Sequence, residues 1–139
     1  MTTALTSTSG TARLAAVVTR WVRETPAPEP ASISLRPERR EVALQPSTVF
    51  GDPVATLGAL LIWTHQLTGI TGDWWHTAGG DLHITLTGRG PCGVTVQVYS
   101  SIPYRIARSQ VALAKGKTES VTPDELYRLA LELRKGQTK

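Results

Sequence analysis

Two histidines that flank a pair of glycines are the residues best suited to chemistry. If Gly79 and Gly80 form a two-residue hairpin turn, which their freedom to adopt positive φ allows, His76 and His83 lie opposite each other on neighbouring strands. Asp81 then shares their face of the sheet, because cross-strand partners lie on the same side. Two imidazoles and a carboxylate suit a transition metal, and imidazoles are also general acids and bases near neutral pH. The spacing matches no known metal motif, so we favour two polar residues on a solvated face.

The same register places the two adjacent tryptophans on opposite faces of the sheet. Trp75 is expected to point into the core beside Leu82 and Ile84, and Trp74 is expected to lie on the open face beside His76. An exposed tryptophan suggests stacking on a base, a sugar or a partner side chain. The alternative is that a helix or the N-terminal segment covers that face.

Positive charge collects in the C-terminal part of the chain. Residues 1–88 carry six basic and seven acidic side chains, whereas residues 89–139 carry nine basic and four acidic ones. Phosphates attract such cations and nucleic-acid bases stack on neighbouring rings. The candidate binding residues of this basic segment, 89–117, are Tyr99, Tyr104, Arg105, Arg108, Lys115 and Lys117. No helix-turn-helix, RRM or zinc-finger signature accompanies them, so a solvated basic flank is the competing interpretation.

Catalysis has little support in the sequence. The glycine-rich stretch 88–93 lacks both the G-x-G-x-x-G pattern and the lysine of a phosphate-binding loop. There is no G-x-S-x-G and no H-E-x-x-H motif, and Cys92 is the single cysteine. We therefore expect no catalytic residues, no cofactor and no metal beyond the weak histidine candidate.

The N-terminal region is organised as a helix followed by a stiff linker. Leu14, Val18 and Trp21 recur at helical spacing, which predicts an amphipathic helix over 11–24. That helix is expected either to pack on its own domain or to dock on a neighbouring chain. The remaining predicted boundaries are a disordered segment at 1–10, a proline-rich linker at 25–31, one domain at 32–135 and a tail at 136–139.

The domain itself alternates between strand and helix patterns. Alternating residues predict a short hairpin over 33–44, and Asp52-Pro53 opens a helix as N-cap and first residue. Valines at 94, 96 and 98 predict a third strand with Tyr99 pointing outward, and Thr122-Pro123 opens a last helix. The pattern predicts an α+β fold with helices packed on one face of a small antiparallel sheet, made of a hairpin and a three-stranded meander. The segment 103–117 stays unassigned.

Composition limits the class of protein. The chain has 139 residues, of which 40% are hydrophobic and 19% charged, as in one ordinary globular domain. The N-terminus does not resemble a signal peptide and no apolar run is long enough to span a bilayer, so we expect a soluble cytoplasmic protein without a membrane partner. Eleven arginines against four lysines suggest a GC-rich bacterial genome.

These observations favour a small non-enzymatic interaction or regulatory module. It would bind a protein partner or self-associate through the polar sheet face or the first helix. The first alternative is a nucleic-acid-binding accessory protein that uses the basic segment 89–117. The second alternative is a histidine-dependent or metal-dependent enzyme.

Overall fold

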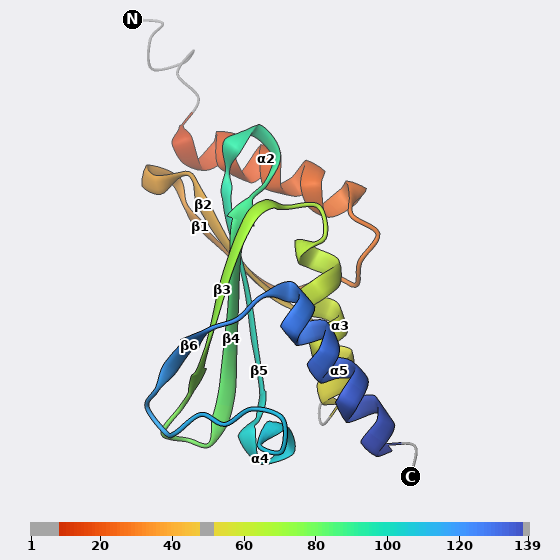
Figure 1. Ribbon diagram of the computed structural model, residues 1–139. Helices are drawn as coiled ribbons and strands as arrows, with labels where there is room; N and C mark the ends of the chain where they lie inside the picture. Colours follow the sequence, from red (N-terminus) through yellow and green to blue (C-terminus); the bar gives the residue numbers. More distant parts are fainter. Residues whose placement is uncertain (1–8, 48–51, 138–139) are drawn as a thin grey trace, which may run out of the picture.

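The computed structural model describes residues 9–47 and 52–137, which form one mixed sheet with helices against one of its faces (Figure 1). The strand order is β1-β2-β5-β4-β3-β6. The strands are β1 (Pro30–Arg36), β2 (Glu41–Pro46), β3 (Thr68–His76), β4 (Asp81–Arg89), β5 (Thr95–Pro103) and β6 (Thr118–Ser120). The helices are α2 (Gly10–Glu24), α3 (Pro53–Thr64), α4 (Tyr104–Ala107) and α5 (Pro123–Gln137), with short 3₁₀ turns η1 (Pro37–Arg39) and η2 (Pro91–Gly93).

The α+β class is confirmed, but the sheet is larger than predicted and is not purely antiparallel. Strands β2 and β5 pair in parallel, with Val42 opposite Val96, and β6 adds a sixth strand beside β3. A parallel pair needs a long crossover, and here α3, β3 and β4 together supply it. Because such a pairing joins residues far apart in sequence, local patterns did not indicate it.

The first helix packs on its own chain. The Ser9 side chain accepts a hydrogen bond from the Ala12 N–H and so caps α2. The buried side chains of α2 are Leu14, Val18 and Trp21, and the helix contacts β1, η1 and η2. Trp21 meets Trp63 of α3 edge to face, with ring centroids 5.3 Å apart. Most of the segment predicted to be disordered, residues 1–8, lies outside the described residues, as do residues 138–139 of the predicted tail.

The two longer helices of the domain begin at capping residues read from the sequence. The Asp52 side chain accepts from the Ala55 N–H with Pro53 at the first position, which confirms the predicted start of α3. At the start of α5, the Thr122 hydroxyl accepts from the Glu125 N–H while the Glu125 carboxylate accepts from the Thr122 N–H. This reciprocal arrangement is a capping box, and it satisfies two backbone N–H groups at the first turn of α5.

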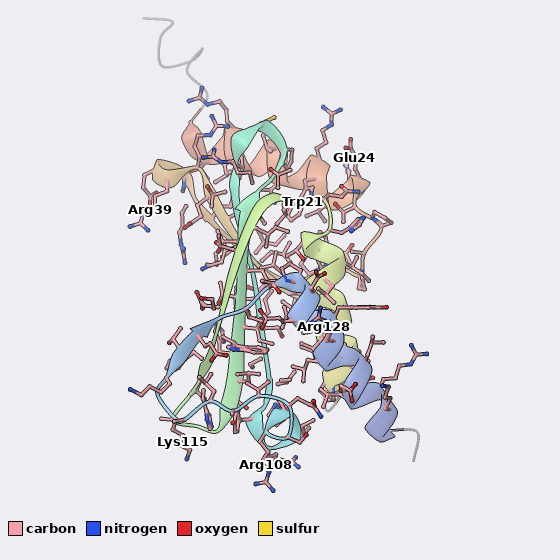
Figure 2. All side chains as sticks on the ribbon, in the orientation of Figure 1. Trp21, Glu24, Arg39, Arg108, Lys115 and Arg128 are labelled. Atoms are coloured by element: carbon pink, nitrogen blue, oxygen red, sulfur yellow. The ribbon has the colours of Figure 1, made fainter. Side chains whose placement is uncertain are left out.

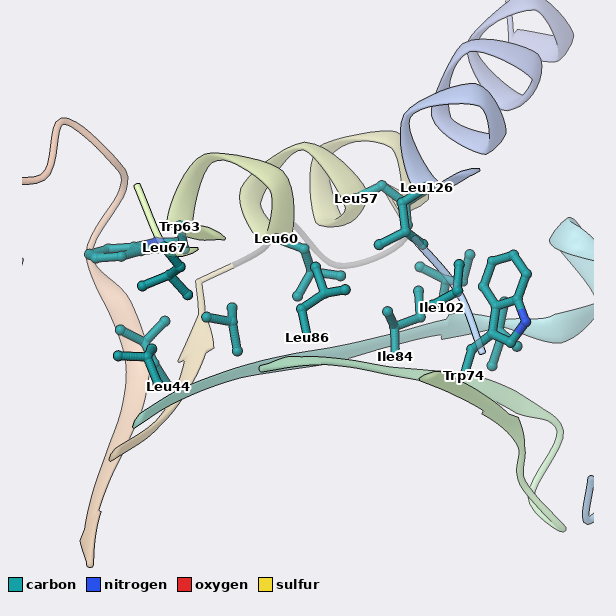
Figure 3. Packing of buried hydrophobic residues seen from close by; sticks show 14 of the residues in the cluster. Leu44, Leu57, Leu60, Trp63, Leu67, Trp74, Ile84, Leu86, Ile102 and Leu126 are labelled. Carbon is teal, nitrogen blue, oxygen red and sulfur yellow. The ribbon is translucent and has the colours of Figure 1, made fainter. Parts of the chain in front are cut away.

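The core lies between the sheet and helices α3 and α5 (Figure 3). Leu57 and Leu60 of α3 and Leu126 of α5 have no exposed surface, and they face Ile84 and Leu86 of β4, which are equally buried. Among residues 9–47 and 52–137, no helix lies on the opposite face of the sheet (Figure 1). Within the described ranges, no helix combines the length and the apolar character needed to cross a membrane.

Candidate functional site

The turn between β3 and β4 is one residue longer than the sequence suggested. The Thr77 N–H donates to the Asp81 carbonyl at 2.8 Å, and the Gly80 N–H donates to the Thr77 carbonyl at 3.1 Å. Gly80 has a φ of 89°, so the turn has three residues and ends in the left-handed region. Trp75 therefore pairs with His83, and the predicted register is wrong by one position. A pair of glycines fits both turn lengths, and the Thr77 side chain stabilises the longer one by accepting from the Asp81 N–H.

This shift separates the two histidines of the proposed metal site. His76 pairs with Leu82 on the helix-covered face, whereas His83 lies on the open face with Asp81. The candidate set His76, Asp81 and His83 is therefore wrong, because a one-residue slip moves a side chain to the other side of a sheet. Among residues 9–47 and 52–137, no three side chains of the metal-ligating types gather.

His76 and Tyr104 hold a loop against the sheet. The buried His76 ring stacks on Tyr104 with centroids 3.7 Å apart, and its Nδ1 lies 2.7 Å from the Leu113 carbonyl oxygen. A carbonyl can only accept, so Nδ1 carries the hydrogen. The Tyr104 hydroxyl donates to the Val111 carbonyl at 2.6 Å and accepts from the Leu113 N–H at 3.0 Å. These two predicted binding residues therefore fix the backbone at 111–113.

The two tryptophans of β3 have exchanged their predicted positions. Trp74 is 5% exposed, and its indole N–H donates to the Glu119 carboxylate at 3.1 Å. Trp75 is 43% exposed and points to the open face. Trp75 is therefore a surface residue that the predicted register had placed in the core. The correct turn length is the signal that would have found it.

An aromatic row crosses the open face, formed by Trp75 on β3, His83 on β4 and Tyr99 on β5. The rings of Trp75 and His83 meet nearly edge to face with centroids 6.3 Å apart, and those of His83 and Tyr99 lie 6.0 Å apart at a tilt of 34°. His83 and Tyr99 occupy the outward positions that the sequence predicted. Polar side chains surround the row: Thr71, Thr85, Thr87, Gln97, Ser101, Thr118 and Ser120.

The charges of the open face nearly balance. Its acids are Glu41, Asp73 and Asp81, and its bases are Arg36 and Arg89, which gives a net charge of −1 (two minus three). Arg36 is already paired with Glu41, at 2.7 Å. The open face therefore offers an aromatic centre surrounded by hydroxyl side chains and little net charge.

The predicted basic residues lie apart from that face, at one end of the molecule. Arg108 and Lys115 both lie at the end of the molecule where β3 turns into β4, far from Arg39 (Figure 2). Arg105 lies on α4, and Lys117 precedes β6. All four basic residues, Arg105, Arg108, Lys115 and Lys117, are exposed and form no ion pair with any described residue.

A groove of about 640 Å³ runs between α2 and the β4–β5 connection. Its lining includes Trp21, Arg89 and Cys92, together with Arg20 and Glu24, whose side chains pair at 2.9 Å. That carboxylate raises the pKa of Arg20. The carboxylate of this lining, Glu24, is held by Arg20, and the lining contains no histidine beside the cysteine.

Comparisons with protein-family models, with curated proteins and with solved structures gave no match to this chain. Its class is therefore described from its own fold and surface. It is an α+β protein whose mixed sheet is covered by helices on one face and open on the other.

Proposed function

We propose that this protein is a non-enzymatic binding module that recognises a folded protein partner through the open face of its sheet. The observation that carries the proposal is the aromatic row, with Trp75 43% exposed at its end. A large indole held in water on a regular strand forgoes burial that would stabilise the fold. Contact with a partner would recover that burial.

The size of the open face suits a protein interface. Six strands about 4.8 Å apart and up to nine residues long present roughly 700 Å². One side of a standard interface buries about 800 Å². Tryptophan and tyrosine supply rigid contact area in such interfaces, while small hydroxyl side chains supply adaptable hydrogen bonds. The polar surround favours a reversible complex over an obligate one.

Nucleic-acid binding is the second candidate, and the unpaired cations at the α4 end are the observation that favours it. Stacking of bases on the aromatic row would, however, bring phosphates over a face that carries Asp73 and Asp81, neither of which is in an ion pair with a described residue. The cations Arg105 and Arg108 lie on α4 and just after it, beyond the end of β5. Protein recognition therefore fits the open face better.

Replacement of the exposed tryptophan tests the proposal. Tagged wild-type protein and the Trp75→Ala variant are used to recover partners from the cells that make the protein, with quantitative mass spectrometry. The control variant is Tyr127→Ala, because Tyr127 is 57% exposed on α5, on the helix side of the sheet. We expect wild type and control to recover the same partner. When that purified partner is titrated, the affinity of Trp75→Ala should be at least about tenfold weaker than that of wild type.

Two results would contradict the proposal. One is a partner whose affinity is the same for wild type and Trp75→Ala. The other is binding of a single-stranded oligonucleotide, followed by fluorescence anisotropy, that is lost in the Arg105→Ala/Arg108→Ala variant and kept in Trp75→Ala. That second result would assign the protein to nucleic-acid binding.

A further inference from the structure

Strand β1 forms one edge of the sheet, and the direction of its backbone groups can be read from the neighbouring strand. The Arg40 carbonyl accepts a hydrogen bond from the Thr95 N–H of β5. In a trans peptide the carbonyl and the following N–H point in opposite directions, so the Glu41 N–H points toward β1. Alternation along β2 then directs the backbone groups of Ala43 toward β1 as well.

The residues of β1 divide accordingly into two sets. Ser34 and Arg36 lie opposite Ala43 and Glu41 and bond to β2, so Ile33 and Leu35 direct their N–H and C=O groups away from the sheet. No hydrogen bond joins these outward groups to any residue within 9–47 or 52–137. The edge of β1 is therefore a set of unpaired donors and acceptors.

The middle of this edge, residues 32–35, lacks the protection that usually blocks strand pairing. Exposed edges commonly carry charged side chains, prolines or a bulge. Residues 32–35 read Ser-Ile-Ser-Leu and include no charge, no proline and no bulge, because the bulge of β1 lies at Ala31 and the strand ends at Pro30 and Arg36. Ile33 is 40% exposed on the side of the sheet that carries the core.

We propose that β1 pairs with β1 of a second copy of this chain, in antiparallel orientation and with Ile33 on the two-fold axis. The outward groups of Ile33 then meet those of Ile33 in the second copy, and Leu35 lies opposite the bulge at Ala31. The isoleucine side chains contact each other on the core side. On the open side Ser32 lies opposite Ser34, so two hydroxyls pair.

The sequence of β1 favours this register over its neighbours. A shift by one residue places outward groups against inward ones, so the ladder is lost. A shift in one direction by one pair brings Pro37, which has no N–H, opposite Ala31. In the centred register Arg36, which already pairs with Glu41 of its own chain, also lies near Glu29 of the second copy, a charge of opposite sign.

The pairing would join two six-stranded sheets into one continuous sheet. Its two-fold axis is perpendicular to the sheet, so both aromatic rows face the same side, with their centres seven strand spacings or about 34 Å apart. The proposal does not depend on the function of the open face. It is decided by the oligomeric state and by how that state responds to substitution of Ile33.

Sedimentation velocity of the full chain over a range of concentrations tests the dimer. We expect a monomer–dimer equilibrium for wild type and at least tenfold weaker association for Ile33→Lys, which sets two charges against each other on the axis. The matched control is Ile62→Lys, because Ile62 is 45% exposed on α3, away from the edge. Circular dichroism of both variants verifies that they are folded.

Cross-linking tests the register independently of any loss of stability. In a Cys92→Ser background, Ile33→Cys places two thiols on the axis, where an antiparallel pair brings Cα atoms about 5.5 Å apart, within disulfide range. Mild oxidation should give a covalent dimer with Ile33→Cys and none with Ile62→Cys. A chain that stays monomeric at every concentration and forms no cross-link overturns the proposal and leaves the edge to an extended segment of another protein. Dimerisation that Ile33→Lys does not weaken also overturns it.

Discussion

Trp74 and Trp75 are chemically identical neighbours with opposite environments. Trp74 fills the space between the sheet and the loop before β6, and its N–H has a carboxylate partner. Trp75 contacts His83 on the open side. Only the pairing of β3 with β4 decides which of the two rings is buried.

Alanine substitution of each tryptophan should therefore give very different stabilities. Trp74→Ala removes a buried ring and should lower the free energy of unfolding by about 3–5 kcal/mol. Trp75→Ala removes an exposed ring, and we expect a change below about 1 kcal/mol. Urea unfolding of the two variants measures both values, and equal losses would disprove the register described for β3 and β4.

For single residues, the sequence predicted which side chains of β4 and β5 point inward, but it did not predict the length of the turn between β3 and β4. The inward positions of Val94, Val96 and Val98 are confirmed, as are those of Leu82 and Ile84. A strict alternation of apolar and polar residues leaves no choice there. In β3 the two residues before His76 are both tryptophan, so the pattern has no preferred face, and the glycine pair did not specify the turn length.

Among the elements, β3 approaches its neighbours most closely at Gly72. A Cβ atom on this residue would lie 2.5 Å from Cδ2 of Leu86 and 2.7 Å from the Val121 carbonyl oxygen. The Gly72 carbonyl also accepts the Val121 N–H, at the junction between β6 and α5. The glycine therefore allows α5 to start close against the sheet.

Two glycine-to-alanine substitutions should change stability in opposite directions. Gly72→Ala should lower the free energy of unfolding by about 1–3 kcal/mol because the methyl group overpacks the core. Gly58→Ala should raise it by about 0.5–1 kcal/mol, because Gly58 lies inside α3 with nothing within 4 Å of the added methyl. Thermal or urea unfolding distinguishes them, and a neutral Gly72→Ala would show that β6 does not pack as described.

Elements with local signals were predictable, and those that depend on distant partners were not. Asp52 and Pro53 mark the start of α3 by chemistry within one turn. The three residues of β6 carry no pattern of their own and become a strand only because β3 is adjacent. Segment 103–117 was unassigned for a related reason, since Tyr104 and His76 fix it through contacts made across 28 residues of sequence.

In the whole molecule, α2 closes one end of the core. Leu14, Val18 and Trp21 belong to the same apolar cluster as the residues of α3 and the sheet. The Trp63 indole N–H beneath this helix has no hydrogen-bond partner among the described residues. Packing, not polar contact, therefore holds α2 in place.

Removal of the anchoring ring should accordingly destabilise the entire domain. We expect Trp21→Ala to lower the free energy of unfolding by about 3–5 kcal/mol while the transition stays cooperative. Thr19→Ala, at an exposed position of the same helix, should stay within about 0.5 kcal/mol. A Trp21→Ala protein as stable as wild type would mean that α2 is not part of the folded core.

The uneven burial of the four tryptophans also provides an optical signal. Trp21, Trp63 and Trp74 are each at most 6% exposed, whereas Trp75 is 43% exposed. A water-soluble quencher such as iodide should therefore quench the fluorescence of Trp75 and leave that of the three buried tryptophans unchanged. Any molecule that settles over Trp75 would shield it, so its arrival could be followed by fluorescence without a label.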